Sequence, residues 1–245
     1  MHFTSERRLD DGVLEREFTL GEIPGILWTP ASASAPAPAP LILVGHPGGL
    51  RRMYPRLAVR ARHSAAEGFA SATIELPGAG DRPRSAAAEQ ARADLRRALE
   101  AGEPVDDEIV DRLVLPLVDK AVPEWRSALD ALLALREIGG PVGYSGGVIA
   151  IGLRLAVVEP RISAALLFAG SFVPRAMFEE ARQVTIPLQV LLQWDDDGND
   201  RQMALDLFDA FGSTEKTLHA NMGGHTGVPQ FEGDAGNRFF VRHLI

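Results

Sequence analysis

Short apolar runs alternate with longer amphipathic segments along most of the chain. Residues 41–44 (Leu-Ile-Leu-Val) are continuously apolar, which is typical of a strand buried on both faces of a parallel sheet. Further strands are predicted at residues 13–20, 23–29, 70–76, 141–142, 162–168, 188–193 and 216–220. Helices are predicted at residues 54–67, 85–101, 122–138, 147–158, 201–211 and 236–244. This order predicts an α/β fold with a mostly parallel central sheet and helices on both faces.

Two segments interrupt this alternation. Residues about 85–121 contain only helical sequence, because residues 106–118 place five apolar side chains on one helical face after the helix at 85–101. Residues 31–40 are an Ala/Ser/Pro-rich stretch, which we interpret as a surface loop. A domain linker is the alternative, but the thirty residues before it are too few for an independent core. We therefore expect one domain over residues 1–245, with a helical insertion at about 85–121.

Composition and charge argue against several classes of binding partner and bear on the cellular location. The formal net charge of −8 argues against a nucleic-acid-binding surface. The absence of cysteine excludes disulfides, thiolate metal sites and a cysteine nucleophile. The N-terminus is charged, and no run reaches the roughly 18 apolar residues that span a membrane. We expect a cytoplasmic protein that binds neither nucleic acid nor membrane, and both a monomer and a homodimer remain open.

A G-x-S-x-G pentapeptide occupies residues 143–147, between a short extended segment and a predicted helix. A serine on a tight strand-to-helix turn has its hydroxyl pushed away from the sheet, and flanking glycines keep other side chains off the backbone. The pattern alone is weak, since chance supplies it in roughly one of ten such chains. Its position after a strand makes Ser145 the candidate nucleophile.

A histidine and a carboxylate downstream complete a candidate catalytic set. His225 lies in a glycine-rich loop after the last predicted strand, and it is the candidate base. His46 also follows a strand, and it is the weaker alternative. The run Asp195-Asp196-Asp197 follows another strand; Asp197 is our first choice for the acid and Asp196 the second. A calcium loop starting at Asp195 is rejected, because Asp200 stands where the obligatory glycine belongs.

Backbone amides near Ser145 are the candidates for binding an oxyanion. The Gly146 amide follows the nucleophile at a predicted helix start. The Gly48 amide lies in the loop after the first buried strand, where Pro47 has no N–H to offer. Because parallel strands carry their carboxyl ends to one edge of a sheet, Ser145, the acid and His225 are expected to meet there.

These motifs together resemble the α/β-hydrolase fold. Residues 143–147 resemble its nucleophile elbow, residues 45–49 its oxyanion loop, and residues 75–82 the Asp-x-Pro-Gly-x-Gly segment after the next strand. The order Ser, Asp, His is the order of that family. Two departures are that Pro47 replaces a usual glycine, and that Trp194 replaces the glycine that commonly precedes the acid by three residues. Asp197 is preferred as the acid because it lies three residues after Trp194.

The resemblance implies a serine hydrolase similar to carboxylesterases and dienelactone hydrolases. Such an enzyme would cleave a small-molecule ester through an acyl-enzyme on Ser145, and it would need no cofactor and no metal. Tyr144 and Trp194 are the candidate substrate contacts, and the insertion occupies the place of a lid. Lactone or thioester hydrolysis is an alternative. A non-hydrolytic protein of the same fold is another, since fold does not determine function.

Overall fold

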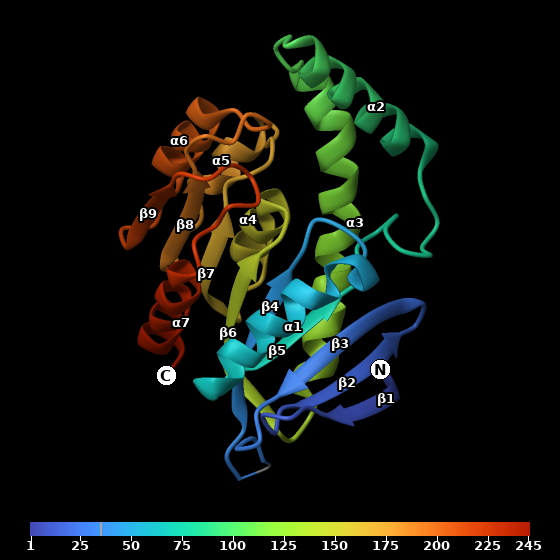
Figure 1. Cartoon of the computed structure of the whole chain (residues 1–245), viewed down its shortest axis with the longest axis vertical. Helices are drawn as coiled ribbons and strands as arrows, with labels where there is room; N and C mark the ends of the chain where they lie inside the picture. Colours follow the sequence, from blue (N-terminus) through green and yellow to red (C-terminus); the bar gives the residue numbers. More distant parts are fainter. Residues whose placement is uncertain (35) are drawn as a thin grey trace.

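A computed structural model of the chain describes residues 1–34 and 36–245. Nine strands form one sheet in the order β1-β2-β3-β5-β4-β6-β7-β8-β9 (Figure 1). The strands are β1 (His2–Arg8), β2 (Leu14–Leu20), β3 (Ile23–Thr29), β4 (Ala39–Gly45), β5 (Ala70–Ile74), β6 (Ile138–Gly146), β7 (Ile162–Phe168), β8 (Leu188–Gln193) and β9 (Lys216–Asn221). From β5 to β9 every neighbouring pair is parallel, whereas β1, β2 and β3 pair antiparallel.

Helices cover both faces of the sheet, as the sequence predicted. They are α1 (Leu50–Ala66), α2 (Ala86–Ala101), α3 (Asp107–Leu133), α4 (Ile149–Val158), α5 (Met177–Ala181), α6 (Arg201–Ala210) and α7 (Phe231–Leu244). Side chains of α1 and α7 pack with one set of strand residues, and those of α3, α4, α5 and α6 pack with the opposite set. The apolar runs of the central strands are therefore buried on both sides.

Three elements differ from the sequence prediction. The pattern at residues 106–118 and the helix predicted at 122–138 form one continuous helix, α3, although Pro116 and Pro123 lie inside it. Strand β1 was not predicted, because its charged sequence pairs only at the sheet edge, with β2. The five-residue helix α5 was also not predicted, because it is too short to show a period.

The predicted insertion corresponds to α2 and the first half of α3. Asp106 begins α3 by accepting a hydrogen bond from the Glu108 amide at 2.8 Å. An ion pair of 3.2 Å between Arg112 and Asp94 joins α3 to α2. Figure 1 shows α2 running beside the upper part of α3. Within the described residues, no helix is both long enough and apolar enough to cross a bilayer.

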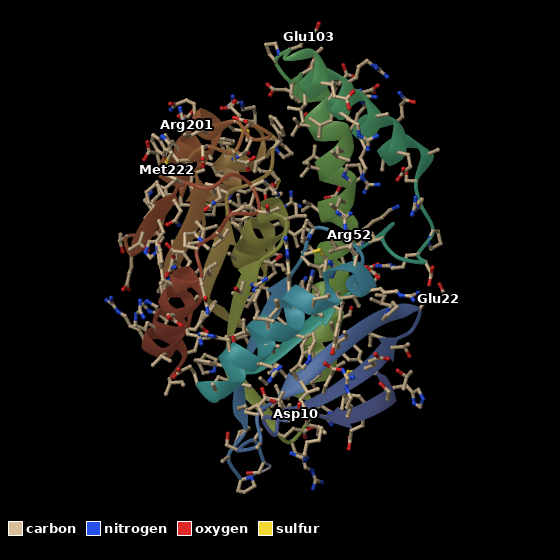
Figure 2. The ribbon with its side chains drawn as sticks, in the orientation of Figure 1. Asp10, Glu22, Arg52, Glu103, Arg201 and Met222 are labelled. Carbon is tan, nitrogen blue, oxygen red and sulfur yellow. The ribbon has the colours of Figure 1, made fainter. Side chains whose placement is uncertain are left out.

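The carboxyl ends of the parallel strands lie at one edge of the sheet. The loop predicted at residues 31–40 lies between β3 and β4 of this same sheet, except that residues 39 and 40 belong to β4; residue 35 is outside the described residues. Figure 2 labels Arg201 and Met222, which mark α6 and the loop after β9 near the ends of β8 and β9. The predicted site residues lie at the end of β6 and in the turns that follow β4, β8 and β9 at this edge.

Candidate active site

A carboxylate and an imidazole meet at the carboxyl edge of the sheet. The Nδ1 atom of His225 lies 2.7 Å from Oδ2 of Asp196. Asp196 is buried, whereas the His225 side chain is 52% exposed. Because the ionised carboxylate can only accept, Nδ1 carries the ring proton and Nε2 keeps a free lone pair. The Phe168 ring meets the imidazole nearly edge to face, with 5.5 Å between the centroids. This arrangement can accept a proton at Nε2 and stabilise the imidazolium that results.

The partner of His225 is Asp196, and the prediction of Asp197 is wrong. Asp195 and Asp196 both accept hydrogen bonds from the loop that carries His225, whereas Asp197 is exposed. Among residues 1–34 and 36–245, the Asp197 carboxylate has no hydrogen-bond or ion-pair partner. Asp197 was chosen because it lies three residues after Trp194. The turn starts directly after β8 ends at Gln193, so the residue that reaches His225 is one position earlier.

The loop that carries His225 is held to the end of β8 by two further side chains. Asp195 accepts hydrogen bonds from the amides of Gly223 and Gly224 at 2.6 and 2.9 Å. Gln193 donates to the Gly224 carbonyl at 2.8 Å. These backbone contacts fix the base of the loop, so that the imidazole keeps its place above the sheet. Asp195 thus holds the backbone of the loop, whereas Asp196 contacts the imidazole.

Ser145 lies within β6, and its hydroxyl contacts an arginine. Its backbone pairs with Val44 on β4 and with Leu166 on β7, and the residue is 7% exposed. Arg60 on α1 donates a hydrogen bond of 2.8 Å to Ser145 Oγ. Within the described part of the chain, no hydrogen bond joins Ser145 to His225. The structure therefore pairs the acid with the base, whereas the hydroxyl of the predicted nucleophile is hydrogen-bonded to Arg60.

The two residues after Ser145 form the bend from β6 toward α4: Gly146 ends the strand, and Gly147 and Val148 precede the helix. Gly146 and Gly147 have φ angles of +75° and +74°, and no residue other than glycine has a positive φ in the described chain. A nucleophile elbow needs the serine itself on the strained turn, with its hydroxyl exposed. The predicted strand–turn–helix context is confirmed, but the serine precedes the turn.

The Arg60 guanidinium is the strongest electrostatic feature beside Ser145, and sequence reasoning did not identify it. It also donates to the Ser145 carbonyl at 3.0 Å and to the Gly45 carbonyl at 3.4 Å. Burial lowers the pKa of Arg60 to about 10, which leaves the group charged at neutral pH. No carboxylate within the described residues forms an ion pair with it. An arginine on an otherwise ordinary helix carries no sequence signal of such a contact.

The predicted oxyanion donors lie near this edge, and the alternative base does not contribute. Gly48 follows β4, and among the described residues its amide donates to no protein acceptor. Gly146 faces Arg60, since a Cβ built on it would lie 2.9 Å from the guanidinium. His46 is buried, with Nε2 placed 2.9 Å from the Ile74 carbonyl, and burial lowers its pKa. His46 therefore acts as a neutral core residue.

The two predicted substrate contacts lie in different surroundings, Tyr144 in the core and Trp194 at the acidic turn. Tyr144 is buried on the opposite face of β6, where its ring packs against Trp125 with 6.1 Å between centroids. Its predicted contact with substrate is wrong, because neighbouring side chains of a strand point to opposite faces. Trp194 is 40% exposed, lies under the Arg201 guanidinium, and lines a depression of about 440 Å³ formed by the acidic turn and the start of α6.

Comparisons with known proteins place this geometry in context. No protein-family model and no curated protein matches the chain. A cold-adapted esterase from an Arctic intertidal metagenomic library, bound to PEG, is 28% identical over 100% of both chains, with a TM-score of 0.78.

Two more distant structures have the same fold. The protein TT1662 from Thermus thermophilus is 18% identical over 94% of this chain and 97% of its own, with a TM-score of 0.64. An acetyl xylan esterase from Paenibacillus sp. R4 is 15% identical over 99% of this chain and 88% of its own, with a TM-score of 0.65. The chain therefore has the α/β-hydrolase fold, which it shares with esterases.

Proposed function

We propose that the protein hydrolyses carboxylic esters of small molecules, with His225 as the general base and Asp196 as its partner. One observation carries this proposal: a buried carboxylate orients an imidazole at the carboxyl edge of the sheet, in a fold shared with esterases. Ligands of open α/β sheets bind outside the carboxyl ends of the strands. The cytoplasmic location and the lid role of α2 and α3 are further parts of the proposal.

The chemistry needs a nucleophile, for which Ser145 at the end of β6 is the candidate, together with a base, an orienting acid and a donor for the oxyanion. His225 accepts a proton at Nε2 while Asp196 stabilises the charge that develops on the ring. The Gly48 amide is the donor in this proposal, because it has no protein acceptor among the described residues. One such donor contributes about 3 kcal/mol of transition-state stabilisation.

A second candidate function is favoured by the contact between Ser145 and Arg60. In this candidate function the buried guanidinium of Arg60 holds the Ser145 hydroxyl, which does not attack an ester. A protein of this fold that binds a ligand without hydrolysing it would show this arrangement. The two candidates differ in whether the purified protein turns over any ester.

The test is hydrolysis of p-nitrophenyl acetate by the wild-type protein and two histidine variants. We expect wild type to be active, and His225→Ala to lose about a hundredfold or more in kcat, because the general base is removed. His63→Ala is the matched control, because His63 also contacts a carboxylate, Asp234 at 3.1 Å, but lies at the far end of α1. Equal activity of wild type and His225→Ala would refute the assignment, and an ester panel without turnover would favour the binding protein.

A further inference from the structure

The start of α1 is capped by a carboxylate from another part of the chain. The residue before the helix is Gly49, which has no side chain to cap it, and the first turn of α1 contains no acid. Glu75 directly follows β5, and both of its carboxylate oxygens accept from the Leu50 amide, at 3.0 and 3.1 Å. A negative charge at a helix N-terminus is stabilising, because the free amides and the helix dipole both favour an anion. Glu75 therefore caps α1 in place of a local side chain.

This carboxylate is buried and has no ionic partner. Glu75 is 6% exposed, and burial raises the pKa of its carboxyl group. Among the residues that the structure describes, no cation forms an ion pair with it. Arg82 donates to the backbone carbonyl of Glu75 at 2.9 Å, but its ion pair is with Glu124. Gly80 leaves room for the carboxylate, since a Cβ built on it would overlap with Oε2 of Glu75. The bond from the Leu50 amide thus stabilises a charge that burial disfavours.

The loop between β4 and α1 is held at both ends by the end of β5. At its beginning, Nε2 of His46 lies 2.9 Å from the Ile74 carbonyl. At its far end, the Leu50 amide donates to Glu75, the residue after Ile74. Gly48 lies between these two contacts, and its amide has no protein acceptor in the described part of the chain. The proposed oxyanion donor therefore depends on the end of β5 for its place.

We propose that Glu75 is a positioning residue for ester hydrolysis, which holds the loop between β4 and α1 so that the Gly48 amide meets the oxyanion. This inference rests on the proposed function. Glu75 does not touch the substrate in this role, because it acts through the Leu50 amide. The Gly48 amide contributes most when negative charge develops on the ester carbonyl oxygen, so a displaced loop lowers kcat and leaves KM nearly unchanged. A cap that served α1 alone would change the stability of the protein and leave kcat as it is.

The experiment first weakens the contact from the side of the carboxylate. Glu75→Gln keeps the shape of the side chain and removes its charge, which weakens the hydrogen bond from the Leu50 amide. We expect kcat for p-nitrophenyl acetate to fall about ten- to a hundredfold, with KM within about twofold of wild type. Glu159→Gln is the matched control, because Glu159 is also buried and accepts hydrogen bonds, from Arg161 and Arg126. It lies between α4 and β7 at the opposite edge of the sheet, so kcat should stay within about twofold of wild type.

A second pair of variants changes the amide instead of the carboxylate. Leu50→Pro removes the N–H at the first position of α1, where proline is tolerated. Gly49 before it already has the extended backbone that a following proline favours, with φ −70° and ψ 141°. Leu50→Ala also loses the leucine side chain but keeps the amide. We expect kcat of Leu50→Pro to lie about tenfold or more below that of Leu50→Ala.

The outcomes separate this inference from the function on which it rests. A wild-type protein that hydrolyses no ester refutes both. With an active wild type, the role of Glu75 alone is refuted if folded Glu75→Gln keeps its kcat, changes only KM, or loses no more than Glu159→Gln. Circular dichroism establishes folding. If Glu75→Gln does not fold, the Leu50 pair decides, and equal kcat in Leu50→Pro and Leu50→Ala refutes the inference.

Discussion

Replacing Asp196 by asparagine is expected to lower kcat for ester hydrolysis by about a hundred- to ten-thousandfold. The carboxylate holds Nδ1 of His225 at 2.7 Å, which keeps the proton on Nδ1 and the lone pair on Nε2. An asparagine of the same shape carries no charge to stabilise the imidazolium. Its NH2 group can also donate to Nδ1, which would move the ring proton to Nε2 and disable the base.

The neighbouring carboxylate is the control for this substitution. Asp197→Asn changes the same charge one residue away, on a side chain without a hydrogen-bond partner in the described structure, so kcat should stay within about twofold of wild type. Steady-state kinetics on p-nitrophenyl acetate measure both variants. If Asp197→Asn showed the larger fall, the observed pairing of Asp196 with His225 would not be the functional one.

Replacing Gly147 by alanine is expected to lower the free energy of unfolding by about 2–5 kcal/mol. The residue has a φ of +74°, and a Cβ would lie 2.8 Å from two backbone atoms of Gly45 and 2.9 Å from the His46 nitrogen. Backbone atoms of β4 cannot move aside as a flexible side chain would. The strain of left-handed backbone and the steric overlap therefore add together.

A second glycine separates these two effects. Gly68 has a φ of +89°, but no atom lies within 4 Å of a Cβ built on it. Gly68→Ala should therefore cost only the backbone strain, about 1–2 kcal/mol. Urea unfolding followed by circular dichroism measures both variants. Equal losses in Gly147→Ala and Gly68→Ala would show that the approach of Gly147 to β4 is less tight than described.

The sequence predicted the fold well because apolar periodicity and glycine-rich turns are local signals. The runs that became β4, β7 and β8 are buried from both sides, so most of their residues are apolar. Two separate helical segments were predicted where the structure has one helix, α3, which contains Pro116 and Pro123. Proline is a local signal, and packing of the buried face of α3 against the sheet outweighs it here.

The site was predicted less completely, because its geometry depends on contacts between distant residues. His225 was identified from its loop, and the acidic turn from its place after β8. Which carboxylate faces the imidazole depends on how the turn after Gln193 folds, and spacing alone does not determine that. The contact of Arg60 with Ser145 joins residues 85 positions apart, and no motif marks it.

The most direct test is a comparison of His225→Ala and Asp196→Asn with the variant that carries both changes. If the two side chains act as one catalytic unit, the second substitution has nothing left to remove. We predict that the double variant hydrolyses p-nitrophenyl acetate no more slowly than the slower single variant. Rate losses that multiply in the double variant would contradict the account, because the two residues would then act independently.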